Sequence, residues 1–173
     1  MLTELLFSSV LSGLVATGLM VVVLYLPALW NGLYYDTLGA IGSIWTRAVN
    51  DRARVLGMLA LLVGGVAFAI FYGAFAMMFI EGRGGFQAPS YVVFATSPVP
   101  IDLFFPLLGL VGGFGHGIFM SLITSFIVTD FHPVEEFRQP LPLILSFLIG
   151  HSVFGVLVMF FHHQLIQSLG GSI

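Results

Sequence analysis

Apolar residues gather in four long stretches, and all the charged side chains lie outside them. The stretches are 5–30, 55–80, 103–129 and 141–166, and none of them contains Asp, Glu, Lys or Arg. A helix needs about 20 consecutive apolar residues to cross the hydrocarbon core of a bilayer. The pattern therefore predicts an all-α fold of four transmembrane helices. Because spans that follow each other closely in sequence are usually neighbours, we expect two antiparallel hairpins.

A shorter helix is expected between the first two spans, at 36–51. Apolar residues such as Leu38, Ile41 and Trp45 recur there at helical spacing, whereas Ser43 falls on the other side. A helix with this pattern lies in the plane of the membrane surface and turns its apolar face toward lipid. An ordered loop is the alternative interpretation. We predict an interfacial helix.

Composition supports one membrane domain over residues 1–173. Hydrophobic residues make up 58% of the chain and charged residues 8%, and the mean hydropathy is +1.08. Soluble domains carry about 25% charged residues. The chain has no cysteine, which excludes disulfides, iron–sulfur clusters and thiolate zinc sites. Its five cations are all arginine and form no basic patch, so the expected partners are membrane lipids and other transmembrane subunits, not nucleic acid.

The arginines predict the orientation of the bundle. The first connection holds Arg47, Arg52 and Arg54, the third holds Arg138, and the second holds Arg83 alone. Cytoplasmic loops carry the excess of arginine in membrane proteins. We therefore expect both termini on the non-cytoplasmic side.

Small residues predict where the helices approach one another. They recur at spacings of three and four in the first span and of four in the third span, and such patterns let helix backbones come close in lipid. The residues expected at helix contacts are Gly13, Ala16, Thr17, Gly65, Gly109, Gly113, Gly117, Gly150 and Gly155.

Two short motifs suggest a family. The pattern G-x-x-F-A-x-x-Y at 65–72 and the pattern G-H-x-x-F-G at 150–155 resemble the signature of an uncharacterised prokaryotic four-helix integral membrane family, a domain of unknown function. The resemblance covers most of the chain, including G-L-V-A-T at 13–17. It implies a four-span topology in a prokaryotic inner membrane and no particular activity. The family often has a histidine in its second helix, where this chain has Leu61.

Two histidines are expected near the middle of the membrane. His116 lies halfway along the third span, and His151 lies about ten residues into the fourth, so the two imidazoles should have similar depth. Neutral imidazole is a common axial ligand of haem iron, and the glycines around His116 would leave room for a flat macrocycle. The pair is therefore a candidate site for b-type haem or a chlorophyll-type pigment. The alternative is that each histidine bonds a neighbouring helix.

A second polar group is expected near the non-cytoplasmic surface. Glu81 ends the second span, and His162 and His163 lie near the end of the fourth. They are candidates for contact with a headgroup, a quinone or a metal, although anchoring at the interface is the simpler interpretation. Nothing in their spacing specifies a metal.

These features predict a small bundle with little chemistry of its own. The spans lack the charged residues that ion pathways usually place in the membrane, which argues against a transporter of ions or small solutes. No nucleophile, base and orienting acid can be placed together, so an enzyme is not expected. The leading hypothesis is an accessory or scaffold subunit of a larger membrane assembly, such as a respiratory or photosynthetic electron-transport complex. A tetrapyrrole-binding subunit is the alternative.

Overall fold

The computed structural model describes residues 2–30, 32, 34–85, 88–93 and 101–169 of the chain. Within them the long helices are α1 (Leu2–Tyr25), α3 (Asp51–Ile80), α4 (Phe104–Phe131) and α5 (Pro140–Ser168). Each is long and apolar enough to cross a membrane, α1 together with the 3₁₀ turn that follows it, Leu26–Trp30. The predicted all-α fold of four spans is confirmed, and the protein is an integral membrane protein.

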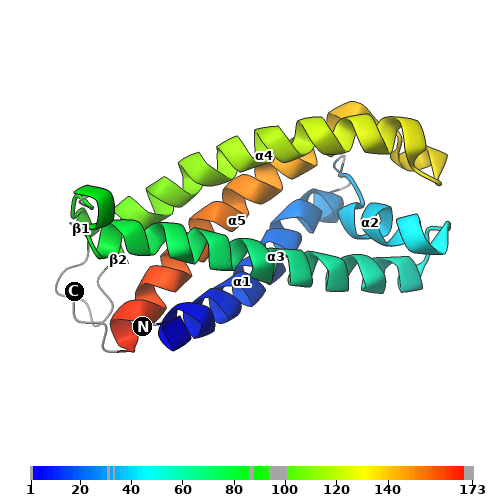
Figure 1. Cartoon of the computed structure of the whole chain (residues 1–173). Helices are drawn as coiled ribbons and strands as arrows, with labels where there is room; N and C mark the ends of the chain where they lie inside the picture. The colour runs from blue at the N-terminus through cyan, green and yellow to red at the C-terminus, as the bar shows by residue number, and fades with distance from the viewer. Residues whose placement is uncertain (1, 31, 33, 86–87, 94–100, 170–173) are drawn as a thin grey trace.

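The helices form two antiparallel hairpins, α1 with α3 and α4 with α5, and the hairpins are joined mainly by the contact of α1 with α5. α1 packs against α3 and also against α5, and α4 packs along α5 (Figure 1). α3 meets α4 through aromatic side chains, for example Phe79 with Phe104, whose ring centroids are 5.4 Å apart. The start of α1 and the end of α5 lie at one end of the bundle, here called the terminal end. The opposite end carries the short helix α2 (Thr37–Thr46) and the connection 132–139, and is here called the α2 end.

The expected short helix is present, but it ends at Thr46, five residues earlier than predicted. Asp36 caps its start by accepting from Gly39 N at 2.9 Å, and Arg47 ends it with φ 54°, in the left-handed region. A Cβ on Gly42 would collide with the Ala53 backbone, and one on Gly57 with the Leu38 backbone. Two such contacts, four residues apart on each helix, place α2 alongside the first turns of α3 (Figure 1).

The remaining elements are short and lie in the connections. Two-residue strands β1 (Val92–Val93) and β2 (Ile101–Asp102) pair antiparallel before α4, and 3₁₀ turns occur at Arg83–Gly85 and Glu135–Phe137. The strand pair was not predicted. The carboxylate of Asp102 holds this segment together, since it accepts from Tyr91 N at 3.1 Å and from Phe104 N at 3.0 Å.

The core lies where the helices touch through small residues. A Cβ on Gly13 would lie 2.7 Å from Ala69 Cβ, and one on Gly65 would collide with Thr17. Between α4 and α5, Gly109 faces Gly155 and Gly113 faces the His151 backbone. Gly117 faces Leu148, Gly150 lies against Leu24 and Met20, and Ala16 is fully buried. Alanine at these glycine–backbone contacts would force the helices apart.

Candidate functional site

The two midplane histidines are in direct contact with each other. The ring centroids of His116 and His151 are 4.6 Å apart and the rings are nearly perpendicular, at 72°. His151 Nδ1 donates to Phe147 O at 2.7 Å, which leaves Nε2 as the ring's acceptor. His116 also lies against Phe68 of α3, with ring centroids 4.3 Å apart. The structure therefore brings together two residues 35 positions apart, in the seam between α3, α4 and α5.

This geometry bears on the tetrapyrrole hypothesis. A macrocycle ligated by both imidazoles lies between them, whereas here the two rings touch each other. Ligation by both therefore requires the rings to move apart. Binding of haem or a pigment at His116 and His151 stays a prediction.

At the terminal end, His162 lies inside the bundle and not at its surface. The side chain is fully buried, and its Nδ1 is 3.0 Å from Ser8 Oγ of α1. Ser8 Oγ in turn donates to Glu4 O at 2.7 Å, so His162 Nδ1 is the donor toward the serine. Gly73 makes room for the ring, because a Cβ there would lie 2.8 Å from His162 Cε1. Ser9 Oγ and His162 Nε2 are buried without a hydrogen-bond partner among the described residues.

The neighbouring His163 is also buried, with 3% of its surface exposed. Its ring stacks on Phe105 of α4 at 4.0 Å and an interplanar angle of 19°, and its Nε2 is 3.3 Å from Gln167 Nε2. Glu81, by contrast, is exposed as the C-terminal cap of α3. Within the described part of the chain, no group of three or more His, Asp or Glu is placed to hold a metal ion. The contacts described for the two imidazoles are with Ser8, Phe105 and Gln167 of this chain.

At the α2 end, a network of hydrogen bonds centres on Asp36. Its Oδ1 accepts from Tyr25 OH and from Gly39 N, and its Oδ2 is 3.0 Å from Arg54 Nε. One carboxylate thus joins the end of α1, the start of α2 and the start of α3. No local pattern predicts this role, because only the fold brings the three partners of Asp36 together.

Three further hydrogen bonds connect α2 and the residue Tyr35 before it to the second hairpin and its connection. Thr37 Oγ1 is 2.8 Å from Ser146 Oγ of α5, and Tyr35 OH donates to Phe137 O at 3.2 Å. His132 Nε2 donates to Ala40 O at 2.9 Å. Burial, followed by the negative charge of Asp36, raises the pKa of Tyr35, so this phenol stays a neutral donor.

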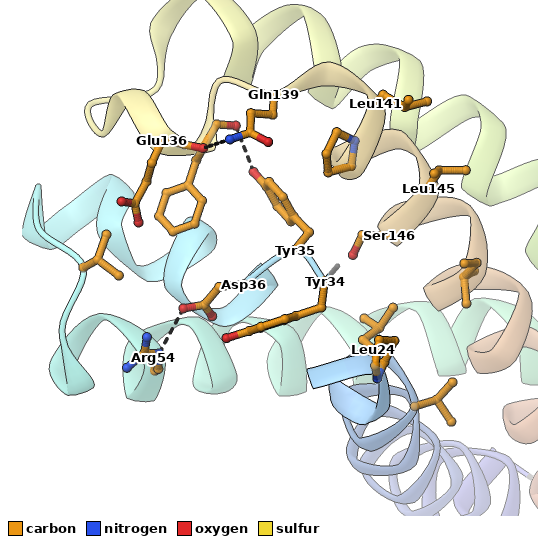
Figure 2. Close-up of a pocket in the computed structure, with 16 residues that line it drawn as sticks. Leu24, Tyr34, Tyr35, Asp36, Arg54, Glu136, Gln139, Leu141, Leu145 and Ser146 are labelled. Atoms are coloured by element: carbon orange, nitrogen blue, oxygen red, sulfur yellow. Dashed lines mark hydrogen bonds and ion pairs between the residues drawn. The ribbon is translucent and has the colours of Figure 1, made fainter. Parts of the chain in front are cut away.

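A cavity of about 690 Å³ opens beside this network (Figure 2). It lies between the end of α1, the segment before α2, the third connection and the start of α5. Tyr34, Tyr35 and Ser146 project toward its middle, and Arg54, Glu136 and Gln139 surround its polar side. No local sequence pattern predicts this cavity, because its lining comes from two parts of the chain, 23–54 and 136–149, that are more than 80 residues apart.

Comparisons with known proteins identify no family. No protein-family model, curated protein or solved structure matches this chain. The resemblance of its motifs to the uncharacterised four-helix family therefore stays a prediction, and the function is argued from geometry alone.

Proposed function

We propose that this protein is an accessory or scaffold subunit of a larger membrane assembly, such as a respiratory or photosynthetic electron-transport complex. It would be held there by packing of its outward helix faces against other transmembrane helices. The proposal is supported by the contrast between two classes of glycine on the spans, those that face another helix of this chain and those that face outward.

The outward glycines carry the proposal. A Cβ added to Gly64 of α3 or to Gly115 of α4 would meet no described atom within 4 Å, unlike one added to Gly109 or Gly113. Glycine inside a helix costs about 0.5–1 kcal/mol relative to alanine. Among the described residues, no close approach of another helix offsets this cost at Gly64 or Gly115. In lipid, a helix face with glycine is what a close-packed neighbouring helix requires.

Purification from native membranes tests the proposal. The tagged protein, extracted in mild detergent, should migrate above its own mass and bring down a fixed partner. Gly115→Leu fills the outward position and should lower partner recovery about fivefold or more, as expected for loss of about 1 kcal/mol of packing. The matched control is Val111→Leu, one turn earlier on α4 at a side chain 72% exposed. Its recovery of partner should equal that of the wild type.

Two results would contradict this function. One is a protein that stays monomeric in the mildest detergents and after cross-linking in the membrane. The other is Gly115→Leu retaining the partner in full while the melting temperature of the isolated subunit is unchanged.

A tetrapyrrole-binding subunit is the second candidate. It is supported by the position of His116 and His151 at one level of the bundle and by Nε2 of His151, which the bond from Nδ1 to Phe147 O leaves as an acceptor. Ligation by both rings would require them to move apart. An absorption spectrum of the purified protein tests it. A Soret or pigment band that disappears in His116→Phe and His151→Phe is expected from this candidate, and a colourless protein from freshly solubilised membranes excludes it.

A further inference from the structure

The cavity at the α2 end lies where two candidate membrane spans meet polar connections. The polar side is formed by the segment before α2 and by the third connection, which hold Tyr34, Glu136 and Gln139. The opposite side is formed by the ends of α1 and α5, two candidate membrane spans. A molecule bound there would have its polar part beside the connections and its apolar part along the helices.

The apolar wall has the length and exposure of a surface for an alkyl chain. Leu141, Leu145 and Ile149 follow one face of α5, and their side chains are 65%, 47% and 49% exposed. At a rise of about 1.5 Å per residue they cover roughly 12 Å along the helix. Val23 and Leu24 of α1 form the facing wall. The lining of the cavity thus extends from the start of α5 toward the middle of that helix.

The polar lining carries a positively charged group, Arg54, on one side and a negatively charged group, Glu136, on the other. Arg54 uses Nε on Asp36 and Nη1 on the fully exposed Asp51, at 3.4 Å, so Nη2 can meet an anion. Tyr34 OH lies nearby as a further donor (Figure 2). Glu136 is exposed on the other side, and Gln139 donates its Nε2 to Glu136 O, which leaves Gln139 Oε1 as an acceptor. The described lining residues thus hold two carboxylates and one guanidinium.

From this arrangement we infer that the cavity binds one phospholipid with a primary ammonium headgroup, of the phosphatidylethanolamine type. Arg54 and Tyr34 meet the phosphate, Glu136 and Gln139 accept hydrogen bonds from the ammonium group, and an acyl chain lies along Leu141, Leu145 and Ile149. The excess of one carboxylate over the guanidinium disfavours an anionic lipid and favours a headgroup that brings a cation. A quaternary ammonium group lacks the N–H donors that Glu136 and Gln139 would accept.

Native mass spectrometry of the delipidated full-length protein tests this inference. Palmitoyl-oleoyl phosphatidylethanolamine should occupy a single site about fivefold more tightly than the matching phosphatidylglycerol or phosphatidylcholine. A fivefold difference in affinity corresponds to about 1 kcal/mol, and a hydrogen bond to a charged group contributes at least this free energy. Soluble glycerophosphoethanolamine, which has the headgroup but no acyl chain, should not bind in the same concentration range.

Three variants separate the parts of the site. Glu136→Gln should reduce the preference for phosphatidylethanolamine to less than about twofold. Leu145→Trp narrows the groove and should lower occupancy by all three lipids, whereas Leu110→Trp, at a side chain of similar exposure on α4, should leave it unchanged. Circular dichroism and the elution volume confirm that each variant is folded.

Several outcomes would overturn the inference. They are equal binding of the three lipids, tighter binding of phosphatidylglycerol, full binding by Leu145→Trp, binding of the soluble headgroup as tightly as the lipid, and displacement of phosphatidylethanolamine by equimolar decylubiquinone. None of these results bears on partner recovery by the Gly115 variant, so the inference and the proposed function fail independently.

Discussion

Buried polar side chains connect helices of this bundle that are far apart in the sequence. Ser8 meets His162 across 154 positions, and Thr37 meets Ser146 across 109. In lipid such bonds are worth about 0.6 kcal/mol on average and up to about 1.7, since the separated helices find other partners. Losing one side of a buried pair costs more, because the remaining group keeps its desolvation penalty.

Ser8→Ala tests this at a single position. The change removes the oxygen that accepts from His162 Nδ1 and leaves an imidazole N–H unpaired in a fully buried place. We expect the free energy of unfolding to fall by about 1–2 kcal/mol, measured by titration of the micellar protein with SDS. Ser168→Ala is the control, because among the described residues its hydroxyl bonds only Leu165 O, at the exposed end of α5, the helix that carries His162. Equal stability of the two variants would contradict a structural role for the Ser8–His162 bond.

For the histidines of α4 and α5, the sequence predicted the position along the helix better than the residues that each side chain contacts. Counting residues from the ends of the spans placed His116 and His151 at one level, and the structure has them in contact. The same counting placed His162 and His163 near the surface, but it did not reveal that both are buried. A span that is apolar on all sides gives no amphipathic pattern from which to tell which side faces protein and which faces lipid.

At the level of elements, α2 illustrates both the strength and the limit of the sequence pattern. Helical spacing predicted a short helix, and its exposed side does carry large apolar residues, Ile44 at 49% and Trp45 at 63% exposure. Its polar and small side, with Ser43 and Gly42, contacts protein instead of water. The close contact of α2 with α3 also requires Gly57 of α3, which lies 15 positions after Gly42. No local pattern therefore links the two helices.

Gly57 and Gly64 form a matched pair for measuring this contact. Both lie inside α3, but a Cβ on Gly57 would collide with the Leu38 backbone, whereas one on Gly64 meets no described atom within 4 Å. Gly57→Ala should lower the free energy of unfolding by about 1–3 kcal/mol through overpacking. Gly64→Ala should raise it by up to about 1 kcal/mol through helix propensity. Thermal melts in detergent compare them, and a Gly57→Ala protein as stable as Gly64→Ala would disprove the close approach of α2.

For the whole molecule, the two ends of the bundle differ in charge and in construction. The α2 end holds Arg47, Arg52, Arg54 and Arg138, and the connection at the terminal end holds Arg83. The α2 end is also where one carboxylate, Asp36, joins three segments. An arginine excess of this kind is typical of the cytoplasmic end of a membrane protein. With four spans, we therefore expect both chain termini on the opposite side.

Single cysteines test this orientation directly, since the chain has none of its own. Ser168→Cys lies at the exposed end of α5 and Glu135→Cys in the exposed third connection, and neither change removes an arginine. A membrane-impermeant maleimide should label Ser168→Cys in intact spheroplasts and Glu135→Cys only after permeabilisation. The reverse pattern would show that four arginines against one do not decide the orientation here. Labelling of both cysteines from one side would contradict the α4–α5 hairpin itself, because the two positions lie at opposite ends of α5.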